Sequence, residues 1–77
     1  MLNFKLIKKE NELVEYRYYP EKSTDYGTVT ASTDGELISI DSAVDDEFNT
    51  YALHLLSRIR KFAKDKSFDE EGMIAWY

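Results

Sequence analysis

The chain has 77 residues, a formal net charge of −5 at pH 7, one histidine and no cysteine. This length suits a single domain spanning residues 1–77. The lack of cysteine excludes disulfides, cysteine–zinc sites and iron–sulfur clusters, and it predicts a cytoplasmic protein because small secreted domains usually carry disulfides. The negative charge weighs against a general nucleic-acid or anionic-membrane binder.

The N-terminal residues lack the targeting patterns that would place the chain elsewhere. No basic segment is followed by the roughly 7–15 apolar residues of a signal peptide. No apolar run approaches the roughly 20 residues that cross a bilayer. We therefore expect the mature chain to begin at Met1 in the cytoplasm, without a membrane association.

Alternation of apolar and polar residues predicts two strands at the start of the chain, Leu2–Lys8 and Leu13–Tyr19. A polar turn at Lys9–Glu12 separates them. Pro20 has no N–H group and therefore ends the second strand. The second strand has two distinct faces, with Val14, Tyr16 and Tyr18 on one and Leu13, Glu15, Arg17 and Tyr19 on the other.

After a polar loop at Glu21–Asp25, a third strand is predicted at Tyr26–Ser32 and a fourth at Leu37–Ile40. Between them the pair Asp34-Gly35 favours a primed hairpin turn, whose two central residues take positive φ angles. The fourth strand would direct two residues to one face, Ile38 and Ile40.

The hydrophobic period then changes to 3.6 residues and predicts a helix over Asp46–Lys64. Ser42 or Asp45 would cap it, and the acids at 45–47 suit the positive end of the helix dipole. The helix carries an apolar stripe along one face, consisting of Phe48, Tyr51, Ala52, Leu55, Leu56, Ile59, Phe62 and Ala63.

The C-terminal residues return to a strand pattern. A polar connection at Lys64–Glu71 leads to Gly72, which allows a sharp change of direction. Met73–Tyr77 has no charged side chain and predicts a fifth strand at a sheet edge, with Ile74 and Trp76 on one side.

The resulting order, ββββαβ, predicts an α+β domain. One long amphipathic helix would pack on one face of an antiparallel sheet of four strands with a fifth, C-terminal strand. The other face of the sheet would be solvated or covered by a partner. A core this small has a narrow stability margin, which favours self-association as a homodimer.

The sequence offers few side chains for chemistry. His54 is the only residue with an unperturbed pKa near neutrality, and no nucleophile or carboxylate can be assigned to it. A small hydrolase or ligand-binding domain centred on His54 is one alternative, against a rim histidine on a solvated helix face. Six acids between Asp34 and Glu47 lack calcium-loop spacing and fit a turn and a helix start. We predict no catalytic residue, no metal site and no cofactor.

A second alternative is a nucleic-acid-associated protein. Four basic residues in the second half of the predicted helix would contact phosphates, namely Arg58, Arg60, Lys61 and Lys64. The same residues also complement the negative end of a helix dipole, and their stems shield apolar surface. The interpretation as solvated helix residues is the simpler one.

The first hypothesis is a non-enzymatic protein-interaction module that self-associates and binds an unidentified protein partner. Tyrosines are dense in the second strand and shortly after it, and tyrosine suits interfaces because it is large, fairly rigid and amphipathic. The interleaved basic residues that a nucleobase-stacking platform needs are scarce there. The candidate interface consists of Tyr19, Tyr26, Leu53, Trp76 and Tyr77.

Three segments carry a resemblance to a protein family. They are Tyr16-Arg17-Tyr18-Tyr19-Pro20, Asp25-Tyr26-Gly27 and the C-terminal Glu70-Glu71-Gly72-Met73-Ile74-Ala75-Trp76-Tyr77. They resemble a family of short, uncharacterised proteins from Gram-positive bacteria. The resemblance implies a cytoplasmic bacterial protein, and it transfers no activity, catalytic residue or binding residue.

Overall fold

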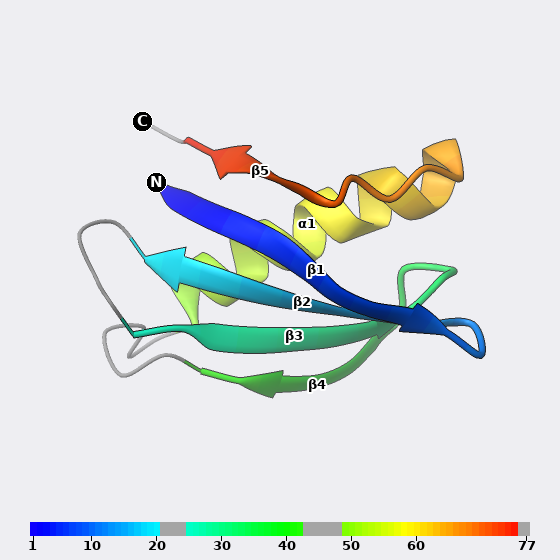
Figure 1. Ribbon diagram of the computed structural model, residues 1–77, viewed down its shortest axis with the longest axis horizontal. Helices are drawn as coiled ribbons and strands as arrows, with labels where there is room; N and C mark the ends of the chain where they lie inside the picture. Colours follow the sequence, from blue (N-terminus) through cyan, green and yellow to red (C-terminus); the bar gives the residue numbers. More distant parts are fainter. Residues whose placement is uncertain (21–24, 43–48, 76–77) are drawn as a thin grey trace.

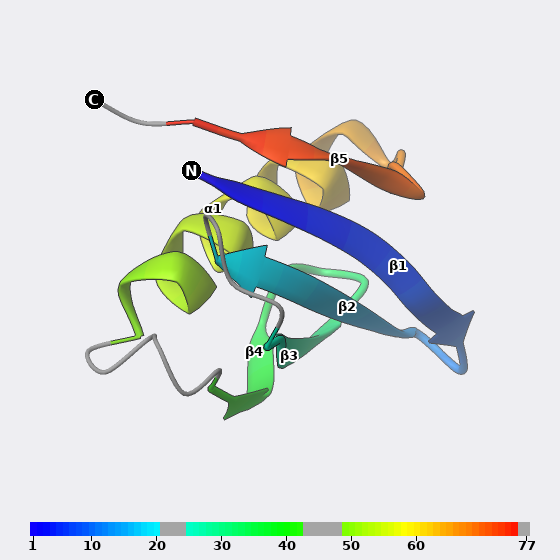
Figure 2. The ribbon, with the colours of Figure 1, turned by 60° about the vertical axis from the view of Figure 1, so that its left-hand side comes forward.

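The computed structural model describes residues 1–20, 25–42 and 49–75, which form one sheet covered on one face by a helix (Figure 1, Figure 2). The elements are β1 (Leu2–Glu10), β2 (Leu13–Pro20), β3 (Gly27–Ser32), β4 (Leu37–Asp41), α1 (Thr50–Asp65) and β5 (Glu71–Ile74). Across the sheet the strands follow the order β4-β3-β2-β1-β5, and each neighbouring pair is antiparallel. The structure confirms the predicted α+β fold and its ββββαβ order.

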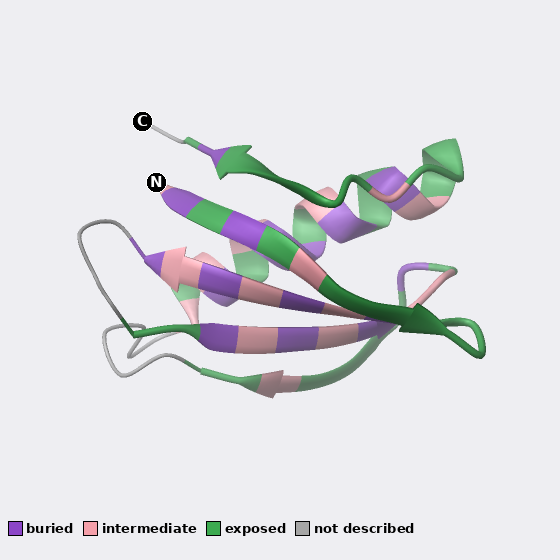
Figure 3. Cartoon of the chain, in the orientation of Figure 1, coloured by how far each residue is buried: buried purple, intermediate pink, exposed green. Residues whose placement is uncertain are grey.

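The core lies between one face of the sheet and one side of α1. In β2, Val14, Tyr16 and Tyr18 have no exposed surface, as their alternation predicts, and Figure 3 shows this alternation along the strands. The predicted helix stripe supplies the opposite wall, with Ala52, Leu55, Leu56, Ile59 and Phe62 buried. Full burial of one large apolar side chain is worth ~1.5–3 kcal/mol, so this contact between the two layers is a main source of stability.

Two glycines lie opposite aromatic residues in the sheet. Tyr18 pairs with Gly27 across β2 and β3, and Phe4 pairs with Gly72 across β1 and β5. A Cβ atom on Gly72 would come within 2.8 Å of the Phe4 ring, and one on Gly27 would overlap the Tyr18 ring. The prediction of a change of direction at Gly72 is therefore wrong, because this residue makes room for a ring inside a strand.

The fifth strand is confirmed, and it begins at Glu71 rather than Met73. It pairs with β1, the strand at the other end of the chain. Ile74 is buried in the core while Met73 is exposed, which agrees with the predicted alternation. Trp76 and Tyr77, the other large residues of the predicted strand, lie outside the described residues.

The two hairpins use different turns. Asn11 and Glu12 both have positive φ angles, 51° and 65°, which is the pattern of a two-residue primed turn. In the second hairpin Gly35 has a φ of 90°, and its N–H donates to the Ser32 carbonyl oxygen at 2.9 Å. Asp34 is not in the left-handed region, so the predicted primed turn is wrong, and a four-residue connection with Gly35 in third position joins these strands.

β1 and β4 each contain a bulge at an isoleucine, which the sequence pattern did not indicate. The pairing with the neighbouring strand skips Ile7 in β1 and Ile38 in β4. The two isoleucines predicted to share a face of β4 consequently differ in burial, since Ile40 packs against the core and Ile38 is 54% exposed. Bulges bend a strand and increase its local twist.

The start of α1 differs from the prediction. Asn49 occupies the N-cap position with a left-handed φ of 58°. Ser42 is not the cap, because it precedes this position and its hydroxyl donates to the Asn49 side-chain oxygen. Asp45, the other predicted cap, lies outside the described residues together with Asp46–Phe48.

The end of α1 is closed by a Schellman motif. Lys66 has a left-handed φ of 56°, a conformation in which glycine is the usual residue. The N–H groups of Lys66 and Ser67 donate to the carbonyl oxygens of Ala63 and Phe62 at 3.2 and 3.0 Å. These bonds satisfy carbonyl groups that a helix end would otherwise leave unpaired.

The connection from α1 to β5 is fixed to the sheet by two long-range hydrogen bonds. The buried Tyr16 hydroxyl donates to the Asp69 carbonyl oxygen at 2.7 Å, and the Leu6 N–H donates to the Glu70 carbonyl oxygen at 2.7 Å. Burial raises the pKa of the Tyr16 hydroxyl well above its ordinary value, and the charge of Asp69 adds to this effect.

Among the described residues, no helix combines the length and the apolar composition that crossing a bilayer requires.

Candidate functional site

The most distinctive surface of the described chain is the side of the sheet that α1 does not cover, which we call the open face (Figure 2). Its residues alternate with the buried ones along each strand, so they point away from the helix. Directly paired residues on this face are Lys5 with Arg17, Lys8 with Glu15, Arg17 with Thr28, and Glu15 with Thr30. The open face is therefore mainly polar.

An arginine and two tyrosines form a compact group on the open face, which we call the Arg17 cluster. The Arg17 Cζ atom lies 4.1 Å from the centroid of the Tyr26 ring, which is a cation–π contact. The ring of Tyr19 lies beside that of Tyr26, with 5.9 Å between the two centroids. Tyr26 is 48% exposed, so the cluster presents an aromatic surface to the outside.

The cluster holds the Arg17 guanidinium in a defined position. Hydrogen bonding with Tyr19 raises the pKa of Arg17, and the nearby Tyr26 also favours the charged form. The Arg17 Nε atom is covered by its surroundings and has no hydrogen-bond acceptor among the described residues. Stacked arginine and tyrosine side chains lose little further freedom on binding, which favours their use as contact residues.

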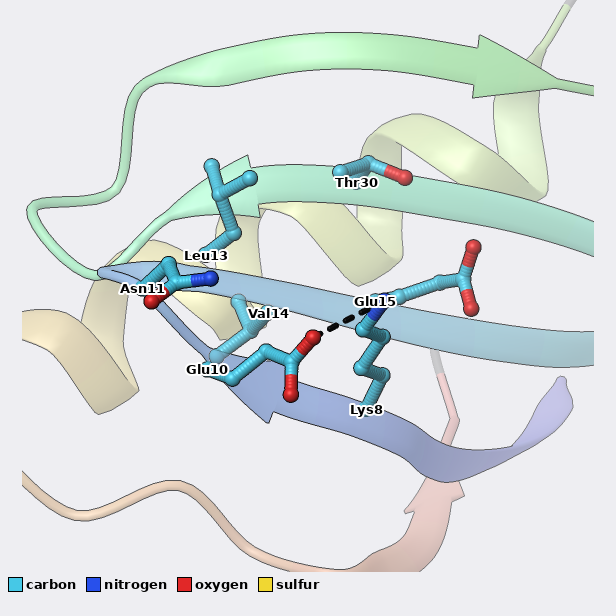
Figure 4. Close-up of a pocket in the computed structure, with 7 residues that line it drawn as sticks. All are labelled: Lys8, Glu10, Asn11, Leu13, Val14, Glu15 and Thr30. Carbon is cyan, nitrogen blue, oxygen red and sulfur yellow. Dashed lines mark ion pairs between the residues drawn. The ribbon is translucent and has the colours of Figure 1, made fainter.

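A shallow depression of about 200 Å³ lies on the open face beside the first hairpin (Figure 4). It is lined by Lys8, Glu10, Asn11, Leu13, Val14, Glu15 and Thr30. The Lys8 ammonium pairs with the Glu10 carboxylate at 3.0 Å, and this hydrogen bond raises the pKa of Lys8. Leu13 is 41% exposed and supplies apolar surface between the charged groups. This arrangement suits contact with a protein surface, since the charged pair is open to solvent.

The structure brings together two of the five predicted interface residues. Tyr19 and Tyr26 are in contact on the open face. Leu53 is 52% exposed, but it lies on α1 and therefore on the other side of the sheet. Trp76 and Tyr77 lie outside the described residues.

The four basic residues of the nucleic-acid alternative lie in different environments. The Arg60 Nε atom donates to the Gly35 carbonyl oxygen at 3.1 Å, so this guanidinium fixes a hairpin to the helix. A second depression is lined by Arg58 and Lys61 together with two acids, Asp65 and Asp69. Lys64 is exposed. Phosphate-binding surfaces concentrate positive charge, whereas these residues are divided and partly offset by carboxylates.

His54 is half-buried on α1, beside a shallow depression lined by Thr50, Leu53 and Ser57 among the described residues. These described lining residues include no carboxylate that would orient the imidazole. In the described ranges, no group of three or more histidine and acidic side chains is arranged to hold a metal ion.

Arg17 is the residue that sequence reasoning missed. The sequence placed it on the face of β2 opposite the core, with Tyr19 two positions away on the same face. Its contact with Tyr26 depends on how the chain returns after Pro20, and no local pattern indicates that path. The signal for this site in the sequence was the high density of tyrosines, and Arg17 is the basic residue that lies among them.

Comparisons with protein-family models, with curated proteins and with solved structures found no significant match to the chain.

Proposed function

We propose that the chain is a non-enzymatic protein-interaction module, and that it binds a partner protein through the open face of its sheet. The observation that carries this proposal is the Arg17 cluster. Tyrosine and arginine are the residues in which interface binding energy concentrates, together with tryptophan. Here an arginine stacks on an exposed tyrosine at 4.1 Å, on the sheet face that α1 does not cover.

The position of two of the three cluster residues on a strand supports the same proposal. Arg17 and Tyr19 belong to β2, which is paired on both sides by β1 and β3. A surface fixed in this way is close to its bound geometry before the partner arrives, which reduces the entropy cost of association. The polar residues around the cluster would then form the solvated rim of the interface.

Site-specific photo-crosslinking in cells that express the chain tests this proposal. A benzophenone amino acid replaces Tyr26 in one variant and Lys61, an exposed helix residue on the other side of the molecule, in a control variant. We expect a discrete protein adduct from position 26 and none of the same mass from position 61. The same adducts from both positions, or none from position 26, would contradict the proposal.

The predicted homodimer stays a prediction. If two copies associate through the open face, Tyr26→Ala weakens the dimer, and sedimentation equilibrium shows a larger share of monomer at equal concentration.

The proposed location is the cytoplasm, which is supported by the lack of cysteine in a chain of 77 residues.

A further inference from the structure

β4 is an edge strand, and one of its sides has no neighbouring strand in the described sheet. An edge strand directs the N–H and C=O groups of alternate residues away from the sheet, where they can bind another extended chain. Two adjacent apolar side chains are exposed on this strand, Leu37 at 37% and Ile38 at 54%. Lysine and proline, which commonly protect such edges, are absent from Leu37–Asp41.

The helix side nearest β4 adds a further apolar residue. The Arg60 Nε atom donates to the carbonyl oxygen of Gly35, in the loop that leads into β4. Leu53 lies two helical turns from Arg60 and therefore on the same side of α1. Leu53 is 52% exposed, so this side of α1 presents an apolar side chain to the outside.

The charged residues of β4 and of the loop before it are all acidic, although Arg60 reaches this loop from α1. Glu36 and Asp41 flank the apolar residues of the strand, and Asp34 lies in the preceding loop, all three exposed. The sequence has no lysine or arginine between Asp34 and Glu47. A binding segment with basic residues at its ends would complement these carboxylates.

We propose that the β4 edge is a second binding surface, separate from the open face, which takes an extended segment of a partner protein with an apolar centre and lysine or arginine at both ends. The segment adds to the sheet as a sixth strand beside β4. Its backbone pairs with β4, its apolar side chains meet Ile38 and Leu53, and its basic ends lie near Glu36 and Asp41.

Two observations favour a partner segment over a second copy of this chain. Pairing β4 with another β4 would gather two copies of Glu36 and Asp41 at one junction, and each copy also carries a net charge of −5. The bulge at Ile38 bends the edge, and a bent edge resists pairing with another folded sheet. A flexible segment can follow this bend.

The test uses a fluorescein-labelled peptide of alternating valine and threonine with two lysines at each end. A matched peptide has glutamates in place of the lysines, and fluorescence anisotropy at low salt measures binding to the full chain. The protein variants are Ile38→Lys, which places a charge on the edge, and the control Leu13→Lys, which makes the same change at a residue of similar exposure on the open face. Thermal melting establishes that both variants fold.

We expect the lysine-flanked peptide to bind at least about tenfold more tightly than the glutamate-flanked one. We also expect Ile38→Lys to weaken binding by a similar factor, with Leu13→Lys unchanged. Equal binding of both peptides, no binding of either, or a loss caused only by Leu13→Lys would overturn the proposal. A wild-type dimer that Ile38→Lys converts to a monomer would overturn it in favour of a second copy. None of these results depends on the crosslink from position 26, so the two proposals fail separately.

Discussion

Tyr18 lies directly opposite Gly27 in the pairing of β2 with β3, and its ring occupies the space that a side chain on Gly27 would need. Phe4 has the same relationship to Gly72 on the other side of the sheet centre. Because Phe4 also pairs with Tyr18, one row across four strands reads glycine, phenylalanine, tyrosine, glycine. Each of the two rings extends over the glycine of its outer neighbouring strand, because these outer positions of the row have no side chains.

This row predicts whether a substitution raises or lowers the free energy of unfolding. Alanine is ordinarily preferred to glycine within a strand by roughly 0.5–1 kcal/mol. At position 27 we expect the opposite, a loss of ~1–3 kcal/mol in the free energy of unfolding for Gly27→Ala, because the new methyl group overlaps the Tyr18 ring. Urea unfolding measures the change. In a Tyr18→Leu background the penalty should shrink, and an unchanged penalty would show that the ring is not its cause.

The Tyr16 hydroxyl predicts a loss of stability at high pH. Its pKa is raised by burial in the folded chain, while in the unfolded chain it lies near 10. The folded state therefore holds this proton more tightly, and the associated stability is complete below pH 10 and decreases as the pH rises above it. Unfolding in urea at pH 8 and at pH 11 should show this decrease in the wild type and a smaller one in Tyr16→Phe.

Tyr16→Phe should also cost about 0.5–1.5 kcal/mol at pH 8, because the Asp69 carbonyl loses its donor. Asp69→Asn is the matched control, since it keeps the backbone carbonyl and removes only the charge. If Asp69→Asn changed the stability at pH 8 as much as Tyr16→Phe, the hydrogen bond would not be the cause.

Two leucines on α1 report the orientation of the helix. Leu55 has no exposed surface, whereas Leu53 is 52% exposed. Truncation of Leu55 to alanine should lower the free energy of unfolding by ~2–5 kcal/mol, because it removes buried methyl groups and leaves a cavity. Leu53→Ala should change it by less than about 0.5 kcal/mol. Thermal melting of both variants checks the difference, and similar effects would mean that the helix packs on another side.

The Schellman motif at the end of α1 offers a stabilising change. Lys66 adopts a left-handed conformation that glycine takes without a steric penalty. Lys66→Gly should raise the free energy of unfolding by about 0.5–1 kcal/mol, measured by urea unfolding. Lys64→Gly, two positions earlier inside the helix, should lower it by a similar amount because glycine is a poor helix former. A destabilising Lys66→Gly would mean that Lys66 makes a contact worth more than the relief of strain.

The strands and the helix whose apolar residues all lie on the core side could be predicted from the sequence. The alternation in β2 and the stripe on α1 both record which side chains are buried, and burial depends mainly on period. The bulges at Ile7 and Ile38 could not be found in this way, because each isoleucine directly follows a leucine, and two adjacent apolar residues do not indicate which of them the ladder skips. The role of Gly72 likewise depends on a partner far away in the sequence.

The candidate site was predicted only in part, for a related reason. The sequence selected Tyr19 and Tyr26 by residue type and by their surface position. It could not select Arg17, whose importance comes from its stacking on Tyr26, which belongs to a later part of the chain. Leu53 is exposed, but its side of the molecule depends on the packing of α1, which lies on the other face of the sheet.

The pairing of β5 with β1 has a consequence for synthesis. Leu2 in β1 pairs with Ile74 in β5. Among the described strands β1 is synthesised first and β5 last, so β1 gains its second neighbour only at the end of this stretch of synthesis. While the ribosome is still producing the helix, β1 is an edge strand whose core residues lack that neighbour. Completion of Glu71–Ile74 therefore closes an edge on which nascent chains would otherwise associate, and shortened translation products would be the aggregation-prone form of this protein.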